Sequence, residues 1–201
     1  MNDPGTSSSR PPALGEPGST RFSVLDVETT GLSPVDDDML QVAIVTSVDG
    51  SIVDEWSSYV RLRHPFAPLG PRHVHGIRRR CVVAAPGLRT VLTEVARRID
   101  HSVVVAHNAI FDWAFLSAAA RRTGIALPSV PRLCTLELSR SLDPERSRSH
   151  RLHAVADGYD VDNARPHDAL HDARTTALVL PRLMADVTAS GRDIDDFYDR
   201  S

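Results

Sequence analysis

Residues 21–32 read RFSVLDVETTGL, and this stretch decides the fold. Its first seven residues form a short apolar run that predicts a buried strand, with Asp26 inside the run and Glu28 directly after it. Because side chains alternate along a strand, Asp26 and Glu28 should point to the same face. Carboxylates on an otherwise apolar strand are costly unless they are paired or bound to a metal. The stretch therefore predicts a first strand that ends in a chemically active acid pair.

The chain that follows predicts a meander of strands and then alternating helices and strands. Further strands are expected at residues 41–48, 51–61 and 102–106, with a hairpin turn at Asp49 and Gly50. Helices are expected at residues 86–100, 109–123, 133–142, 150–158 and 168–190. Asn108 should cap the second of these helices, Gly124 should end it, and Pro181 should bend the last one. This order of elements predicts an α/β fold with a mixed sheet.

The composition indicates a single domain with a tail at each end. The 201 residues are 41% apolar, which is enough for one core. Residues 1–20 are rich in Pro, Gly and Ser and should form a flexible N-terminal tail, whereas residues 191–201 should form a short C-terminal tail. The domain itself is expected at residues 21–190.

Neither a signal peptide nor a run long enough to span a bilayer is present, so no membrane partner is expected. Cys81 and Cys134 are far apart and lack zinc-ligand spacing. A cytoplasmic protein without a disulfide framework is therefore expected. All 23 basic residues are Arg and the net charge is −3, which excludes a domain whose basic charge alone announces nucleic-acid binding.

Two further acids lie where phosphodiester chemistry would place them. Asp112 lies in the first turn of the helix expected after the strand at 102–106, and Asp172 lies in the last expected helix. Carboxylates that converge on one point repel and raise their own pKa values unless divalent cations neutralise them. Hard oxygen ligands favour Mg²⁺ or Mn²⁺, and two such ions can activate water and hold the leaving oxygen. With two divalent ions added to a net charge of −3, the protein would carry about +1, which is no barrier to a phosphate backbone.

Each of these acids also has a purely structural interpretation. Asp26 and Glu28 could form a salt-bridge or hairpin-edge pair. Asp112 could serve the helix dipole, and Asp172 could share a solvated helix face with Arg174.

The spacing of two histidines leaves a zinc site as an alternative. His167 and His171 have the i,i+4 spacing of a zinc site such as H-E-x-x-H, but Asp168 stands where that motif needs Glu. For His73 and His75, a surface or loop position is the simpler interpretation.

Three motifs distinguish between these interpretations by their order and separation: VLDVETTGL at 24–32, AHNAIFDWAFL at 106–116 and HDALHDARTT at 167–176. Together they resemble the exonuclease motifs of the DnaQ-like (DEDDh) 3′–5′ exonuclease superfamily, which includes the proofreading epsilon subunit of bacterial DNA polymerase III. The segments HVHGIRRRCVVAAP at 73–86 and RLHAVADGYDV at 151–161 also resemble segments of that superfamily. The resemblance covers residues 21–184. Within the superfamily, the chain is similar in particular to the exonuclease domain of the epsilon subunit.

This resemblance implies a ribonuclease H-like fold, a mixed sheet flanked by helices, and a role for each matching residue. Two divalent cations, Mg²⁺ or Mn²⁺, would be held by Asp26, Glu28, Asp112 and Asp172. His167 would be the general base. Five residues of continuous helix would turn it about 140° away from Asp172, so we expect it at the junction before the helix. The expected substrate-binding residues are Thr29, Thr30, Gly31, Leu32, His75 and Asn108, with Leu32 wedged against the last base.

The expected function is a metal-dependent 3′–5′ exonuclease that acts on single-stranded DNA ends and releases 5′-nucleoside monophosphates. An RNA-trimming enzyme similar to oligoribonuclease or ribonuclease T stays open, because contacts to the 2′-hydroxyl decide that choice. A module that only binds nucleic-acid ends would be expected to lack an acid or His167, and all five residues are present.

Two departures from the family pattern stand out. Cys134 replaces the usual Asp before Thr135, which we interpret as a packing difference. The final residues, DIDDFYDRS, resemble neither the polymerase-binding segment nor the clamp-binding peptide of epsilon subunits. We therefore expect a free-standing enzyme, or one loosely associated with DNA replication or repair.

Overall fold

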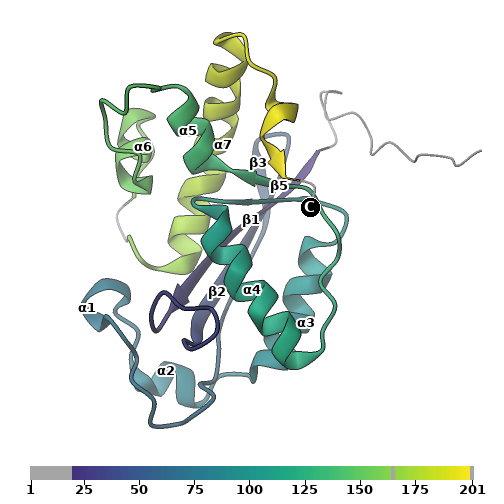
Figure 1. The fold of residues 1–201 in the computed structure, drawn as a ribbon, viewed down its shortest axis with the longest axis vertical. Coiled ribbons are helices and arrows are strands. Elements are labelled where there is room, and N and C mark those ends of the chain that lie inside the picture. Colours follow the sequence, from purple (N-terminus) through teal and green to yellow (C-terminus); the bar gives the residue numbers. More distant parts are fainter. Residues whose placement is uncertain (1–19, 164–165, 200–201) are drawn as a thin grey trace, which may run out of the picture.

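A computed structural model describes residues 20–163 and 166–199 of the chain. Its centre is a sheet with the strand order β3-β2-β1-β4-β5-β6 (Figure 1). The strands are β1 (Arg21–Thr29), β2 (Met39–Val48), β3 (Ser51–Tyr59), β4 (Val103–Ala106), β5 (Arg132–Cys134) and β6 (Tyr198–Asp199). β1, β4 and β5 are parallel, whereas β2 is antiparallel to both β1 and β3, and β6 is antiparallel to β5. The mixed sheet of an α/β fold is therefore confirmed.

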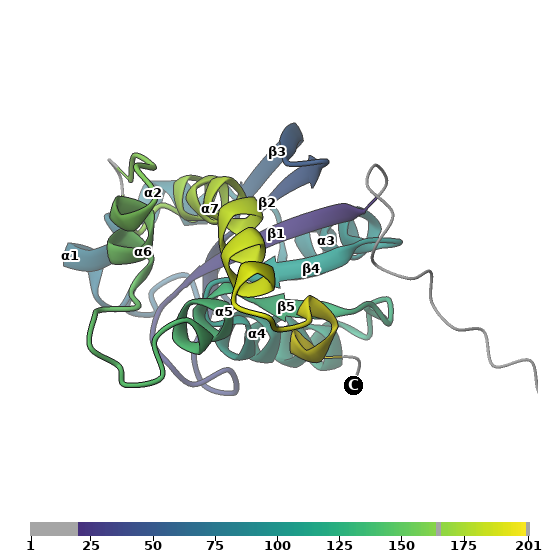
Figure 2. The same cartoon turned by 90° about the horizontal axis from the view of Figure 1, so that it is seen from above.

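Helices cover both faces of this sheet (Figures 1 and 2). They are α1 (Arg72–His75), α2 (Arg79–Val83), α3 (Leu88–Ile99), α4 (Ala109–Thr123), α5 (Thr135–Ser141), α6 (Leu152–Gly158) and α7 (Ala169–Ala189). A 3₁₀ turn, Ile194–Phe197, precedes β6. Among the described residues, no helix is long and apolar enough to cross a membrane.

The alternation of side chains along β1 divides the interior into two cores. Val24 packs with α5, α6 and α7 on one face, whereas Leu25 and Val27 pack with α3 and α4 on the other. A smaller apolar cluster, which includes Leu40 and Ile77, packs the segment of α1 and α2 against the end of β2. Because β1 is buried on both faces, its carboxyl end is held rigidly between two layers of helices.

Most of the expected elements are confirmed by the structure. The helices expected at residues 86–100, 109–123 and 168–190 lie at α3, α4 and α7, and Gly124 ends α4 in the left-handed conformation with its N–H bonded to Ala120 O. The hairpin turn at Asp49 and Gly50 joins β2 to β3, and both residues have positive φ.

Four expectations need correction. The helix expected from residue 133 begins only at Thr135, because residues 132–134 form β5 beside β4. Asn108 occupies the N-cap position of α4, but it has a φ of 78° and its side chain makes no capping bond. Part of the expected C-terminal tail, Tyr198–Asp199, pairs with β5 as an edge strand. α1 and α2 were not expected as helices because they are too short for periodicity to reveal them. The expected N-terminal tail lies, apart from Thr20, outside the described residues.

The packing of α7 predicts that substitutions at two nearby leucines will change the free energy of unfolding by very different amounts. Leu180→Ala should lower the free energy of unfolding by about 2–5 kcal/mol, because it leaves a cavity in the core beside Val24. Leu178→Ala is the matched control, since Leu178 is 42% exposed on the same helix and should cost no more than about 0.5 kcal/mol. Chemical denaturation measures both changes. Equal losses at the two positions would contradict this placement of α7.

Candidate active site

The acid pair of β1 lies at the carboxyl end of the strand, on the face that α7 covers. Asp26 is paired across the sheet with Ala43, which belongs to the core under α7. Glu28 follows two residues later and pairs with Gln41, so it points to the same side. The expectation that both carboxylates share a face is confirmed.

Asp112 and Asp172 reach the same point from helices on opposite faces of the sheet. The pairing of β1 with β4 extends no further than Val24 and Val105, so the N–H of Val27 has no strand partner on that side. Asp112, in the first turn of α4, accepts this N–H at 3.1 Å. Asp172, in the first turn of α7, accepts the N–H of His167 at 2.7 Å. Asp26, Glu28, Asp112 and Asp172 are called the carboxylate cluster below.

Burial raises the pKa of every member of the carboxylate cluster. Desolvation raises the pKa of Asp26 well above its usual range, and the charges of Asp112 and Asp172 raise it further. Burial, followed by the charges of Asp172 and Asp168, raises the pKa of Glu28 to about 8. Desolvation also raises the pKa of Asp112 and of Asp172, although each accepts a backbone N–H that opposes the shift. The unbalanced negative charge of the cluster adds to the effect of burial.

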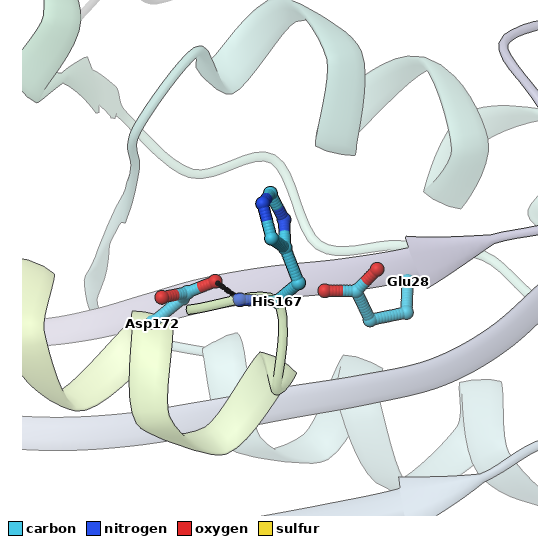
Figure 3. A group of neighbouring side chains, drawn as sticks. All are labelled: Glu28, His167 and Asp172. Carbon is cyan, nitrogen blue, oxygen red and sulfur yellow. Dashed lines mark hydrogen bonds between the residues drawn. The ribbon is translucent and has the colours of Figure 1, made fainter. Parts of the chain in front are cut away.

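The donor atoms of the site fit divalent cations. In the described part of the chain, no arginine forms an ion pair with the carboxylate cluster. Asp172 Oδ1 is buried and has no hydrogen-bond partner there. Donor atoms of Glu28, His167 and Asp172 lie within 4.8 Å of one another (Figure 3). Oxygen-rich sets of this kind suit hard cations such as Mg²⁺ and Mn²⁺.

His167 lies outside the helix that carries Asp172, as expected from their spacing. It stands two residues before α7 with a φ of 67°, and its side chain is exposed. Asp168 caps α7 by accepting the N–H groups of Leu170 and His171 at 3.2 Å. Only the backbone N–H of His167 donates to the Asp172 carboxylate, and its imidazole forms no hydrogen bond with that group (Figure 3). The metal-ligand group of the described residues does not include His171, so the geometry does not favour the zinc alternative.

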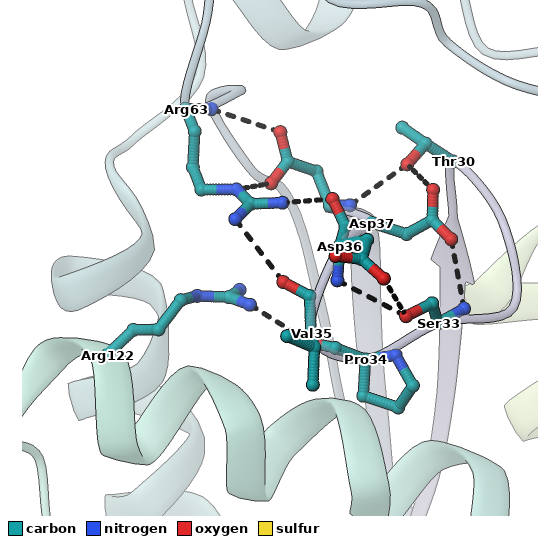
Figure 4. A network of polar contacts seen from close by, with 9 residues as sticks. Thr30, Ser33, Pro34, Val35, Asp36, Asp37, Arg63 and Arg122 are labelled. Atoms are coloured by element: carbon teal, nitrogen blue, oxygen red, sulfur yellow. Dashed lines mark hydrogen bonds and ion pairs between the residues drawn. The ribbon is translucent and has the colours of Figure 1, made fainter.

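Side-chain hydrogen bonds within the turn after β1 hold its shape, and those of Thr30, Ser33 and Asp37 are drawn in Figure 4. The Thr29 hydroxyl donates to Gly31 O at 2.6 Å, and the Thr30 hydroxyl donates to Asp37 at 3.0 Å. A Cβ on Gly31 would lie 2.4 Å from the Asp37 carboxylate, so any larger residue there would displace the side chain that holds Thr30 and Ser33. These threonines therefore shape the turn, whereas Leu32 is 83% exposed and free to contact a ligand.

A second network holds the same turn against the body of the domain. Asp38 forms an ion pair with Arg63 and also accepts the Arg63 N–H at 3.1 Å. Arg122 of α4 donates to Pro34 O at 3.1 Å. Gly70 approaches so closely that a Cβ there would lie 1.9 Å from Thr30 O.

Of the other two expected substrate contacts, His75 lines a cavity beside the cluster, whereas Asn108 lines neither cavity there and lies at the start of α4. His75 is buried, and its Nδ1 accepts the Ile77 N–H at 3.0 Å, so Nε2 carries the proton that it donates to Leu69 O at 2.9 Å. Both ring nitrogens are thus occupied, and His75 offers a ligand only the side of its ring. Asn108 is exposed in the left-handed conformation at the start of α4.

His107 is a residue of the site that the sequence did not single out. Its Nε2 lies 2.9 Å from His150 O and its Nδ1 lies 3.0 Å from the Thr135 hydroxyl. Since a carbonyl can only accept, Nε2 carries the proton and Nδ1 accepts from Thr135. Burial lowers the pKa of His107 to about 4, so it is neutral at pH 7. Its position between β4 and Asn108 was the only available signal.

Two cavities meet at the cluster. The smaller has a volume of about 410 Å³ and is lined by the turn after β1, by α1 and by Phe111. The larger, of about 940 Å³, opens toward α5 and α6. Asp26, His107, His167 and Asp172 line both.

Comparison with known proteins identifies this arrangement. The family model of the RNase_T exonucleases matches residues 23–180, which contain the whole carboxylate cluster and His167. The chain belongs to this exonuclease family.

Relatives of this chain include much longer polymerases. DNA polymerase III of the PolC type from Bacillus cereus is 32% identical over 177 residues, which cover 87% of this chain and 12% of the relative. The PolC-type polymerase III from Oceanobacillus iheyensis is 36% identical over 163 residues, which cover 81% of this chain and 11% of the relative. The chain thus spans only about an eighth of the length of such relatives.

Solved structures confirm the ribonuclease H-like fold and the DnaQ-like resemblance. Exonuclease I of E. coli, in a zinc-bound complex with single-stranded DNA, matches with a TM-score of 0.73 at 18% identity, over 85% of this chain and 43% of that one. Exonuclease X in complex with 5′ overhanging duplex DNA matches with a TM-score of 0.65 at 26% identity, over 89% of this chain and 97% of that one.

The raised pKa of Glu28 predicts a pH-dependent stability in chelator. An unfolded Glu ionises near pH 4.3, whereas folded Glu28 ionises near 8, so the fold loses stability as the pH rises between these values. Glu28→Gln should therefore raise stability at pH 8 by about 1–3 kcal/mol, or about 2–4 °C in Tm per kcal/mol, and change it little at pH 4. Thermal unfolding across this pH range measures the difference.

Glu55→Gln is the control of opposite sign. Its hydrogen bond with Arg174 lowers the pKa of Glu55, so removing that charge should not stabilise the protein at any pH. A Glu28→Gln variant that is destabilised equally at pH 4 and pH 8 would contradict the assignment of repulsion to this site.

Proposed function

We propose that the chain is a metal-dependent 3′–5′ exonuclease that hydrolyses the terminal phosphodiester of single-stranded DNA and releases 5′-nucleoside monophosphates. The observation that carries this proposal is the convergence of the carboxylate cluster, with raised pKa values, beside the exposed imidazole of His167. A purely structural role for these acids would require cationic partners, and none of the described arginines pairs with them.

The carboxylate cluster would hold two divalent cations, Mg²⁺ or Mn²⁺. When bound, such cations supply the positive charge that offsets the acids and stabilises charge on the phosphoryl oxygens. Asp112 and Asp172 are held for this role by the backbone N–H groups of Val27 and His167. The free, buried Oδ1 of Asp172 supports this assignment, because an unpartnered charged oxygen is otherwise costly.

His167 would take the proton of the attacking water. Its ring is exposed and makes no hydrogen bond with the described residues, so a nitrogen is free to accept a proton. Imidazole is the side chain that most often takes a proton in general-base catalysis. The backbone N–H of His167 also holds the Asp172 carboxylate in place, so this residue both positions a metal-binding acid and supplies the proposed base.

The smaller cavity would receive the 3′-terminal nucleoside. Its volume of about 410 Å³ lies toward the low end of the roughly 300–1,000 Å³ typical of small-ligand pockets. Gly31 lets the backbone approach the sugar, Leu32 and Phe111 offer apolar contacts to the base, and His75 forms part of the wall. Thr29 and Thr30 act by holding the turn, and Asn108 stays a proposed contact at the entrance.

The comparisons support DNA as the substrate. The relatives are DNA polymerases, and Exonuclease X, which this chain matches almost end to end, was solved with duplex DNA that has a 5′ overhang. RNA stays the second candidate, and any association with a polymerase, loose or tight, is a proposal because the chain matches only 12% of such a relative. The free thiols of Cys81 and Cys134 fit the reducing cytoplasm that we propose as its location.

The direction of degradation tests the function. With Mg²⁺ or Mn²⁺, a single strand with a blocked 5′ end should be shortened, whereas a strand with a 3′-phosphate should resist, because the smaller cavity would seat a free 3′ terminus. Gel analysis of end-labelled DNA and RNA of matched sequence measures this, with chelator as the control. Hydrolysis that continues in chelator, or that starts from the 5′ end, would disprove the proposal. Faster loss of RNA would select the second candidate.

A substitution at His167 separates base from ligand. His167→Ala should reduce kcat about 10²–10⁴-fold, with partial recovery at high pH where hydroxide replaces the missing base. Metal affinity, measured by calorimetry, should change little, because only the imidazole is lost and the N–H to Asp172 is kept. Asp172→Ala is the control that should lose affinity and activity together. Equal loss of metal affinity in both variants would make His167 a ligand and reopen the zinc alternative with His171.

A further inference from the structure

The larger cavity beside the carboxylate cluster differs in chemistry from the smaller one. Three arginines line it: Arg140 of α5, Arg146 of the following loop and Arg151 just before α6. No arginine is among the described residues that line the smaller cavity. Asp26 and Asp172 lie at the junction, so the cavity that contains the arginines begins at the acids that would face the proposed phosphodiester.

The charges of these arginines are not used elsewhere in the described part of the chain. The side chains of Arg140, Arg146 and Arg151 are exposed and form no ion pair or hydrogen bond there. Other arginines are engaged, such as Arg63 with Asp38 and Arg174 with Glu55. A cluster of unpaired guanidinium groups around one cavity, in a chain with a net charge of −3, is suited to an anionic ligand.

The loop that carries two of the arginines is held in place by buried groups. The Asp143 carboxylate accepts from the Ser147 hydroxyl at 2.8 Å and from the Arg148 N–H at 3.0 Å. The buried His150 ring has Nε2 3.2 Å from Asp143 and Nδ1 2.9 Å from the Ser139 hydroxyl. The loop is therefore preorganised between α5 and α6.

The same loop is tied directly to the active site. His107 Nε2–H donates a hydrogen bond of 2.9 Å to His150 O, and His107 lines both cavities. This hydrogen bond fixes the loop that carries Arg146 and Arg151 relative to Asp26 and Asp172, where the two cavities meet. A ligand that spans both cavities would thus meet a rigid boundary between them.

We propose that the arginine-lined cavity binds the sugar–phosphate backbone of the strand on the 5′ side of the scissile phosphate. This proposal rests on the proposed function. An exonuclease that removes one nucleotide from a 3′ end has one nucleoside on the 3′ side of the bond, and a polyanion on the 5′ side. The cavity of about 410 Å³ fits the single nucleoside, whereas the cavity of about 940 Å³ has the volume and the charge for the polyanion.

The lining also defines how the strand is recognised. No Phe, Tyr or Trp is present among the described residues that line the larger cavity. Stacking platforms that bind single strands depend on such side chains. The cavity should therefore hold phosphates and ignore base identity, and its contribution should depend strongly on salt.

The test uses two substrates and the full chain. An oligodeoxynucleotide has phosphates upstream of the scissile bond, whereas the 4-nitrophenyl ester of thymidine 5′-phosphate has the same terminal nucleoside and none. In the variant with Arg140→Ala, Arg146→Ala and Arg151→Ala, KM for the oligonucleotide should rise and hydrolysis of the nitrophenyl ester should stay at the wild-type rate. Arg121 is an exposed arginine of α4 that lines neither cavity, so Arg121→Ala should change neither KM for the oligonucleotide nor the rate with the nitrophenyl ester.

Equilibrium binding supplies a second measurement that does not require catalysis. With Ca²⁺ in place of Mg²⁺, the slope of log affinity against log salt should fall by about 2 in the triple alanine variant, because each neutralised phosphate of a single strand contributes about 0.7 to that slope. Lysine at all three positions should restore the slope, because the slope counts charges.

The outcomes separate this proposal from the proposed function. An unchanged oligonucleotide KM and salt slope in the triple alanine variant would overturn the backbone site while leaving the exonuclease intact. Equal loss of activity on both substrates would also overturn it, because the arginines would then act on the reaction itself. A wild-type chain that hydrolyses neither substrate would overturn the exonuclease, and the binding slope would still decide the backbone site.

Discussion

The carboxylate cluster gathers four like charges in a corner of the fold from which much of the surrounding water is excluded, and the pKa of each acid is raised in consequence. Such a group persists only if the rest of the fold holds its members together against their repulsion. Backbone N–H groups of Val27 and His167 fix two of the acids, and the rigid end of β1 fixes the other two. The fold thus loses stability at this one place, where the proposed cations would restore it.

The stability that offsets this loss lies in the two cores on either side of β1. Val24 and its neighbours pack under α7, whereas Leu25 and Val27 pack against α3 and α4. The helices that bear Asp172 and Asp112 belong to different cores. The two acids therefore approach each other only beyond the last paired residues of β1 and β4. The arrangement that packs the domain is therefore the same one that assembles the site.

Around the cluster, neighbouring segments have separate physical tasks. The turn after β1 is locked by Thr30, Asp37 and Asp38, which leaves Leu32 as its exposed apolar group. On the other side, Asp143 and His150 lock a loop that leaves arginines exposed. In both places buried polar bonds hold the backbone, so that the outward side chain is presented without further ordering. His107, which is neutral at pH 7, donates to His150 O of that loop and lines the cavities on both sides of the cluster.

The sequence by itself determined the long elements, because apolar runs mark the strands β1, β2 and β4, helical periodicity marks α3, and Gly124 marks the end of α4. It also determined the shared face of Asp26 and Glu28 and the position of His167 before its helix, since both follow from local spacing. Only the tertiary structure decided the pairing of β5 with β6, the role of His107 and the gathering of Arg140, Arg146 and Arg151. These depend on contacts between segments far apart in the chain, which leave no periodic or local pattern to read.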